Sequence, residues 1–359
     1  MFSSSDAGEL YAAGTVGEIG RLGPEHSRRV NGSMIARYAA DGREAALLEL
    51  PMHPKELMAL DDGVLLVADD EPWRPGRRLV AAAAFVVRLD RNLDVRWVRP
   101  LAARVERAKV RLPAGVLIDM QGRDLEVVDL DGRVRALPNT ASHAGTLALG
   151  PDGSVTLSRG GRIEHHPVRS SSWRFELGST ASALAWTDDE RLLVSIFHSE
   201  SAKILGVLRE SDVEVLQQGR SLPPRERGVS GRGIVALDRN GRLLRGHALP
   251  FAPELEPAAN GGAWLVEALG YTTRALGRVL PAPGNSEQTS VWVGHVDREL
   301  ALTRAFVLHP LADTDRTAGV SDTSALPSGR LLVTASFSNA PHAHERSWPS
   351  SIYLMRVEP

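Results

Sequence analysis

The sequence contains no cysteine, which excludes disulfides, thiol nucleophiles, thiolate zinc sites and iron–sulfur clusters together. An excess of charge of one sign is also lacking, because 42 basic and 44 acidic residues leave a formal net charge of −2. Nucleic acid is therefore not an expected partner. The longest uninterrupted apolar run, residues 79–87, is only nine residues long, so we expect no membrane-spanning helix.

Lysine is scarce as well: only three of the 42 basic residues are lysine, and the other 39 are arginine. Arginine suits bidentate binding of carboxylates and phosphates. A GC-rich coding bias produces the same excess of arginine, so the arginine content alone indicates no function. Hydrophobic residues make up 43% and charged residues 24% of the chain, which is typical of a folded globular protein.

The chain does contain a repeat of short apolar strands separated by tight turns. The clearest copies begin at Asp6, Asp61, Asn260 and Ser328. Further tight turns are predicted at Asp131-Gly132, Asp152-Gly153 and Asn240-Gly241. An Asp-Gly or Asn-Gly pair between alternating apolar runs favours a hairpin with a type I′ turn. No long window keeps a helical apolar period free of glycine and proline. The sequence therefore predicts an all-β fold.

Four-stranded antiparallel units at a spacing of roughly 40–50 residues are typical of β-propeller blades. We predict a single β-propeller over residues 1–359, with seven four-stranded blades as the best count and six or eight as alternatives. The predicted blades cover residues 1–50, 53–101, 106–139, 143–177, 181–250, 254–310 and 318–359. The fifth is overlong, and we interpret residues 202–217 as an extra hairpin between its second and third strands. The rival interpretation makes this hairpin half of a separate, degenerate blade.

The copy at residues 61–98 carries a recognisable pattern. An Asp-Gly turn and an apolar strand are followed by a loop, by Val-Arg-Leu-Asp-Arg-Asn and by an apolar strand with tryptophan. This pattern, repeated around residues 328–357, resembles the bacterial delta-60-type repeat of the quinoprotein-like and WD-like propellers. The resemblance implies a scaffold rather than an activity, and an extracytoplasmic location in a bacterium. The vicinal cysteines of many quinone-binding propellers are absent, so we expect no quinone cofactor.

The two ends do not fit a complete ring of blades. Residues 8–14 match a second strand, which leaves residues 1–5, a segment we consider too short, for the innermost strand. Residues 352–357 match a third strand with no fourth strand after it. We expect about two strands to be missing at this seam. We also expect that Met1 is not the native start and that a signal peptide has been removed upstream.

Long connections are predicted on one face of the propeller. They join second and third strands at residues 16–32, 69–79, 198–231, 270–289 and 338–350. Long loops on a rigid scaffold often carry binding groups, and tryptophan and arginine are enriched in binding hot spots. We therefore predict that this face binds a protein, peptide or glycan. Its candidate residues are Trp73, Arg74, Arg78, His198, Tyr271, Arg274, His342, His344, Arg346 and Trp348.

An alternative hypothesis is an enzyme whose site lies at the mouth of the central channel, where the innermost strands begin. Imidazoles and carboxylates there would serve a metal-assisted or His/Glu-dependent lyase or hydrolase. The candidate catalytic residues are His53, Glu56, His143, Glu256 and Asp322. His342 and His344 have the spacing of two metal ligands on an extended segment, so a divalent metal is an alternative there. No motif selects a reaction, and no cofactor is predicted.

Overall fold

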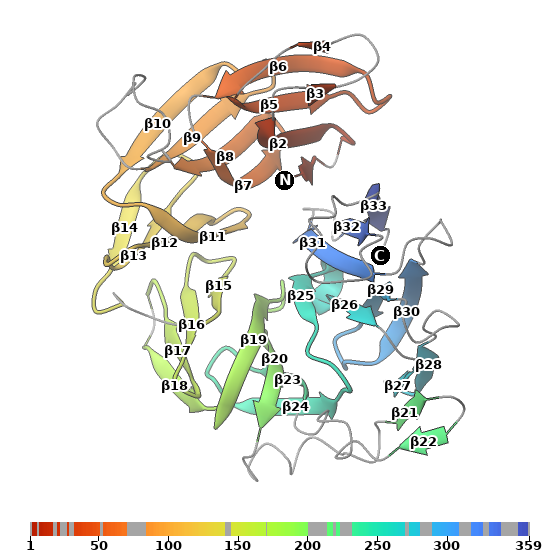
Figure 1. The fold of residues 1–359 in the computed structure, drawn as a ribbon. Helices are drawn as coiled ribbons and strands as arrows, with labels where there is room; N and C mark the ends of the chain where they lie inside the picture. Colours follow the sequence, from red (N-terminus) through yellow and green to blue (C-terminus); the bar gives the residue numbers. More distant parts are fainter. Residues whose placement is uncertain are drawn as a thin grey trace. The chain divides into compact units, whose positions relative to one another are not determined.

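The computed structural model describes most of the chain (Figure 1). The described residues are 2–5, 7–16, 20–21, 27–28, 32–50, 53–69, 84–140, 145–169, 171–199, 214–217, 220–222, 232–269, 273–280, 289–308, 317–325, 330–338 and 351–357. They contain no α-helix, and none of them forms a helix able to cross a membrane. The fold is a β-propeller of antiparallel sheets, as predicted. It comprises two compact units, Met1–His143 with Pro151–Gly153, and Ala144–Gly150 with Ser154–Pro359.

The first unit contains three four-stranded sheets, named A to C in chain order. Sheet A comprises β1 (Phe2–Ser4), β2 (Leu10–Val16), β5 (Gly32–Tyr38) and β6 (Glu44–Leu50), with the hairpin β3 (Gly20–Arg21) and β4 (Ser27–Arg28) between β2 and β5. Sheet B comprises β7 (His53–Leu60), β8 (Gly63–Asp69), β9 (Ala84–Asp90) and β10 (Val95–Leu101). Sheet C comprises β11 (Val105–Arg111), β12 (Gly115–Met120), β13 (Leu125–Val128) and β14 (Val134–Leu137). The first strands β1, β7 and β11 contact one another in turn.

The second unit contains sheets D to G. Sheet D comprises β15 (Leu147–Leu149), β16 (Val155–Arg159), β17 (Arg162–His166) and β18 (Trp173–Glu176). Sheet E comprises β19 (Ser179–Trp186), β20 (Leu192–Ser199), β23 (Gly233–Leu237) and β24 (Leu243–Ala248). Sheet F comprises β25 (Glu254–Pro257), β26 (Ala263–Leu269), β29 (Ser290–Val296) and β30 (Leu302–Leu308), with the 3₁₀ turn η3 (Ala259–Gly261). Sheet G has three strands, β31 (Thr317–Ala325), β32 (Leu331–Ser338) and β33 (Ser351–Val357). The first strands β15, β19, β25 and β31 again contact one another in turn.

A further four-stranded sheet, the insert sheet, is built from two connections within the second unit. Its order is β22 (Arg220–Leu222), β21 (Glu214–Gln217), β27 (Thr273–Ala275) and β28 (Arg278–Leu280). The hairpin β21–β22 lies between β20 and β23, and the hairpin β27–β28 lies between β26 and β29. A hairpin is therefore inserted between a second and a third strand, but it spans residues 214–222 and shares only 214–217 with the predicted range of 202–217. It is also half of a separate sheet, and residues 202–213 of the predicted hairpin lie outside the described residues.

The burial pattern explains why these segments form strands of different composition. All seven residues of the second strand β8 are buried, because a central strand contacts a neighbouring sheet on each face. In the fourth strand β10 only the last residue, Leu101, is buried. Continuous apolar runs in the sequence are thus inner strands, whereas the outermost strands carry the charge.

One turn recurs between third and fourth strands. The carboxylates of Asp90, Asp129, Asp238 and Asp297 each accept hydrogen bonds from the backbone N–H groups two and four residues later. Within the turn that follows Asp129, only Gly132 has a positive φ, of 79°. The turn predicted as type I′ is therefore a three-residue loop that ends in a left-handed residue.

At the two ends of the chain, one prediction is wrong and one is confirmed. The segment judged too short does form the first strand of sheet A, because Phe2 pairs with Ala12 and Ser4 pairs with Leu10. Three residues suffice, since β1 also contacts β7 of the next sheet. β33 is a third strand that pairs with β32 from Phe337↔Ser351 to Leu331↔Val357, as expected.

Neighbouring sheets are joined by a contact that occurs in both units. Trp97 of β10 donates a hydrogen bond from Nε1 to the carbonyl oxygen of Leu130 at 3.2 Å. Its ring lies against Gly132, where a Cβ would come within 3.2 Å of the indole. In the second unit, Trp173 of β18 donates to the carbonyl oxygen of Arg239 at 2.8 Å. In β10 and β18 a tryptophan of the outer strand thus contacts the third-to-fourth-strand turn of another sheet.

Candidate functional site

The long connections all join second to third strands. They are residues 17–31, 70–83, 200–232, 270–289 and 339–350, whereas the other connections within sheets are short turns. We call the edge of each sheet at which the second strand ends and the first and third strands begin its loop edge, and the opposite edge its turn edge. This uneven distribution is what the sequence predicts.

Most of the predicted binding-face residues, and the predicted catalytic residues His143 and Asp322, cannot be compared with the structure. Trp73, Arg74, Arg78, His143, Tyr271, His342, His344, Arg346 and Trp348 lie outside the described residues. His198, Arg274 and Asp322 lie in β20, β27 and β31, where the backbone is described and the side chains are not. Their roles, and the metal site at His342 and His344, stay predictions.

The remaining predicted catalytic residues lie in first strands, as expected. His53 and Glu56 are on β7 of the first unit, and Glu256 is on β25 of the second. The Nδ1 atom of His53 lies 3.4 Å from Ser33 Oγ of sheet A. Glu256 Oε1 accepts a hydrogen bond of 3.0 Å from Thr323 Oγ1 of sheet G. Both side chains therefore contact a neighbouring sheet, and their convergence on one site stays a prediction.

A buried aspartate lies opposite His53 at the loop edge of sheet B. Asp69 is the last residue of β8, is only 1% exposed, and pairs in register with His53. Its Oδ2 atom lies 3.4 Å from Lys55 Nζ and 4.0 Å from Arg104 Nε. Two cations around one carboxylate make this an ion-pair cluster. Among the described residues, no group of three or more histidine or acidic side chains could hold a metal ion.

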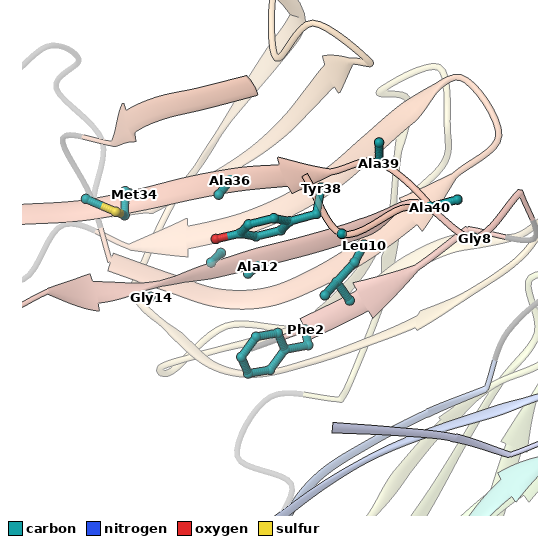
Figure 2. A pocket seen from close by; sticks show the side chains of 12 residues that line it. Phe2, Gly8, Leu10, Ala12, Gly14, Met34, Ala36, Tyr38, Ala39 and Ala40 are labelled. Atoms are coloured by element: carbon teal, nitrogen blue, oxygen red, sulfur yellow. The ribbon is translucent and has the colours of Figure 1, made fainter. Parts of the chain in front are cut away.

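The first unit also has an apolar cavity of about 520 Å³ on one face of sheet A (Figure 2). It is lined by Phe2, Gly8, Leu10, Ala12, Ala13, Gly14, Met34, Ala36, Tyr38, Ala39, Ala40 and Gly42. The opposite face of sheet A contacts sheet B through Tyr11 and Ile35. Burial and the nearby Glu44 carboxylate raise the pKa of Tyr38, whose hydroxyl therefore stays protonated. Because none of the described residues that line it is charged, this cavity can hold apolar groups, and those residues offer no acid–base pair.

The group of residues best suited to bind a ligand lies at the loop edge between sheets E and F. Phe197 is near the end of β20, and Arg232 directly precedes β23. The guanidinium carbon of Arg232 lies 4.8 Å from the centroid of the Phe197 ring, a cation–π contact. Phe197 is 43% exposed. The chain leaves sheet E for the insert sheet just after Phe197 and returns just before Arg232, so both lie at the base of the insertion.

An ionisable group, Glu267, stands in the apolar interface of the same two sheets. It is the one charged residue of β26, between neighbours that are mostly buried, and it pairs in register with Trp292. Burial, and to a smaller extent the Glu254 carboxylate, raise the pKa of Glu267, which is about 7. The N–H of Ala268, which donates to Oε1 at 3.2 Å, and the Arg232 guanidinium oppose this shift. The side chain therefore exchanges a proton near neutral pH.

The raised pKa of Glu267 predicts a stability change with pH. Because the folded state holds this proton more tightly than the unfolded chain does, its contribution to stability falls as pH rises from 4.5 to about 7. The expected loss is about 3 kcal/mol over this window. Glu267→Gln should remove this loss, because glutamine does not ionise. Urea unfolding of both proteins across the window measures it, and parallel pH profiles for the two would contradict it.

The insert sheet is anchored to the core of the second unit. Val215 of β21 pairs with Thr273 of β27, which joins the two hairpins. Leu280, the last residue of β28, is 2% exposed and belongs to the core cluster between sheets E and F. Leu276 packs against the same cluster. The insertion is therefore held against the sheets beneath it by apolar contacts.

Removing this anchor should have a measurable effect. Leu280→Ala is expected to lower the free energy of unfolding by about 2–4 kcal/mol, since it removes a fully buried side chain and leaves a cavity. The neighbouring Val279 is 49% exposed, so Val279→Ala is the matched control, with an expected change within about 0.5 kcal/mol. Hydrogen exchange at residues 273–280 should accelerate in the first variant only. Equal exchange in both variants would show that Leu280 does not anchor the sheet.

The sequence patterns do not predict Glu267, Arg232 or Phe197 as site residues. A signal for Glu267 was present, because a lone carboxylate interrupts the apolar strand Ala-Trp-Leu-Val-Glu-Ala-Leu at Ala263–Leu269. No comparable signal marks Arg232, which is one of 39 arginines. Its position becomes informative only when the fold brings it to Phe197.

Comparison with known proteins supports the fold. No protein-family model matches the chain, and no curated protein matches it. A structure from an analysis of two prolyl endopeptidases aligns with 94% of this chain at 13% identity and a TM-score of 0.52, and the alignment covers 45% of that longer chain. A chain of the mitotic checkpoint complex aligns with 93% of this chain at 10% identity and a TM-score of 0.51, and 82% of that chain is covered. At these identities the likeness shows the propeller fold alone.

Proposed function

We propose that this protein is a binding scaffold whose loop edge between sheets E and F receives a protein, peptide or glycan. The observation that carries the proposal is the insert sheet, in which the long connections of two neighbouring sheets pair with each other. Pairing joins two connections that would otherwise be separate loops into one surface, and Leu280 fixes that surface to the core. A rigid scaffold that presents built-up loops on one side is a common arrangement for recognition.

The solved structures agree with either of two classes of function. One similar chain comes from prolyl endopeptidases, which are enzymes, and the other comes from an assembly of proteins. Because a shared fold does not decide function, the residues of the site must. Exposed Phe197 with its stacked arginine is an aromatic and arginine pair of the kind enriched in binding hot spots.

Arrays of immobilised peptides and glycans test the proposal. Wild-type protein, the double variant Phe197→Ala/Arg232→Ala and the control Arg239→Ala are applied side by side. Arg239 lies on the turn edge of sheet E and its side chain is 72% exposed, so its loss leaves the loop edge intact. We expect ligands of the wild type to be retained by the control and lost by the double variant. Binding that is lost in the control, or unchanged in the double variant, would contradict the proposal.

A second candidate function, acid–base catalysis at the same place, is favoured by one observation. A carboxyl group with a pKa of about 7 is suited to give and take protons near neutral pH. A lyase or hydrolase acting through Glu267 would convert a ligand found on the arrays. This function would be established if the wild type converts the ligand and the Glu267→Gln variant still binds the ligand but does not convert it. Unconverted ligand with the wild type would leave the binding scaffold as the function.

A further inference from the structure

Arg232 differs from three other arginines with little exposed side chain. Arg37 donates to Glu9 at 2.7 Å, Arg191 pairs with Asp189 at 2.9 Å, and Arg88 pairs with Asp62. Within the described part of the chain, Arg232 has no carboxylate oxygen within ion-pair distance. Its one hydrogen bond there runs from a terminal guanidinium nitrogen to the carbonyl oxygen of Pro250, at 3.5 Å. Among the described residues, its buried Nε atom has no hydrogen-bond partner.

The Arg232 guanidinium is partly removed from water, and most of its N–H donors have no partner among the described residues. It therefore lacks the anion that would complete an ion pair. Its planar fork matches the two oxygens of a carboxylate, and desolvation strengthens the bond. The ring of Phe197 holds the guanidinium plane in place from one side. The arginine is therefore oriented before any ligand arrives, which lowers the entropy lost on binding.

We propose that Arg232, stacked on Phe197, binds a carboxylate of a peptide ligand at the loop edge between sheets E and F. This inference rests on the proposed binding function and names the chemistry of its ligand. The carboxylate has two sources in a peptide, an acidic side chain or the C-terminus, and the geometry of the guanidinium suits both. A ligand with one negative charge fits this place better than a dianion does. The reason is that Glu267, which interacts electrostatically with Arg232, also interacts with a second acidic residue, Glu254.

Glu267 gives the proposed site a dependence on pH. The charged groups that act on it are Glu254, on β25, and Arg232, which precedes β23. When Glu267 is protonated, it does not compete for the arginine, and its hydroxyl can donate a hydrogen bond to the incoming carboxylate. When it is ionised, it repels that carboxylate and attracts Arg232 itself. Affinity should therefore fall as pH rises through about 7.

The test uses three small probes and the whole protein. N-acetylglycine represents a C-terminal carboxylate, N-acetylglutamic acid α-amide represents an acidic side chain, and N-acetylglycinamide is the neutral control. Binding is followed by protein-observed NMR at pH 6 and pH 8. We expect one or both carboxylates to bind the wild type at pH 6 and the neutral amide not to bind. At pH 8 the affinity for the carboxylates should be lower by roughly tenfold or more.

Variants separate the arginine from the fold. Arg232→Ala should weaken carboxylate binding roughly tenfold or more, and Arg232→Lys, which keeps the charge but loses the fork, should lie between it and the wild type. Glu267→Gln should bind equally at both pH values, because its amide is neutral throughout. The control Arg239→Ala should behave as the wild type does.

Other outcomes overturn the inference. Equal binding of the carboxylates and the neutral amide, or an unchanged affinity in both Arg232 variants, would show that Arg232 is not the anion anchor. No binding of either carboxylate would have the same consequence. These failures differ from a failure of the proposed function, because peptides or glycans without a carboxylate would still bind the loop edge on the arrays.

Discussion

Arg191→Ala is expected to lower the free energy of unfolding by about 3–5 kcal/mol, because it removes a largely buried guanidinium together with its charge-assisted hydrogen bonds. The side chain is 8% exposed and its Nε lies 2.9 Å from Asp189 Oδ2. Its terminal nitrogens donate to the carbonyl oxygen of Gly261, at 2.5 Å, and to that of Arg298. One arginine at the turn edge of sheet E thus holds two turns of sheet F. Its loss removes a charged donor from two carbonyl oxygens, whereas Asp189 keeps the Arg298 guanidinium at 3.1 Å.

Urea unfolding monitored by tryptophan fluorescence measures this effect. The control is Arg239→Ala, which removes an exposed ion pair with Glu190 at 3.4 Å and should change stability by less than about 1 kcal/mol. A similar effect of the two substitutions would show that the contacts of Arg191 with sheet F add nothing to the packing of sheets E and F.

Gly115→Ala is expected to destabilise the first unit by about 3 kcal/mol or more, because two penalties coincide. Gly115 begins β12 with a φ of +108°, a conformation that side-chain-bearing residues rarely adopt. A Cβ there would also lie 2.1 Å from the carbonyl oxygen of Val128 on the neighbouring strand. Backbone atoms of a central pair of strands cannot move away without breaking the ladder.

Gly14→Ala provides the matched comparison within the same unit. Gly14 lies in β2, has no positive φ, and a Cβ there would meet nothing within 4 Å. This substitution should leave stability unchanged or raise it by up to about 1 kcal/mol, because alanine restricts the unfolded chain. Calorimetry of both variants is the measurement. If Gly14→Ala lowers stability as much as Gly115→Ala does, the positive φ and the close contact with Val128 are not the reason that glycine is required at position 115.

Much of the propeller could be predicted because its strands are local and distinct in composition. The seven buried residues of β8 form one apolar run, and Asp-Gly or Asn-Gly marks a turn between β13 and β14 and another between β23 and β24. The turn type was predicted wrongly, because sequence alone does not show that the aspartate carboxylate captures two N–H groups and leaves only one residue left-handed. The first strand was missed because three residues carry no periodicity, and contact with β7 stabilises them.

The insert sheet, Glu267 and Arg232 could not be predicted from the sequence, for a different reason. β21 and β27 are four and three residues long, and about sixty residues separate them, so their pairing depends on the packing of sheets E and F. Glu267 likewise acquires its raised pKa only when sheet E covers it. The same applies to Arg232, whose lack of a carboxylate partner among the described residues is a property of the assembled interface.

The most direct test of this account is a cross-link between the two connections that form the insert sheet. Val215 and Thr273 are directly paired on adjacent antiparallel strands, a separation that a disulfide can span. The chain has no cysteine of its own, so a bond in the Val215→Cys/Thr273→Cys variant is unambiguous. The control, Leu222→Cys/Thr273→Cys, places one cysteine on β22, one strand further away.

The pairing predicts that mild oxidation of the first variant gives an intramolecular disulfide, seen by mass spectrometry of non-reduced peptides, and that the control stays reduced. The locked protein should also keep the carboxylate binding of the wild type. If the two introduced thiols of the first variant stay free, or if the control pair forms as readily, the two connections do not form one sheet. The surface to which binding is assigned would then not exist.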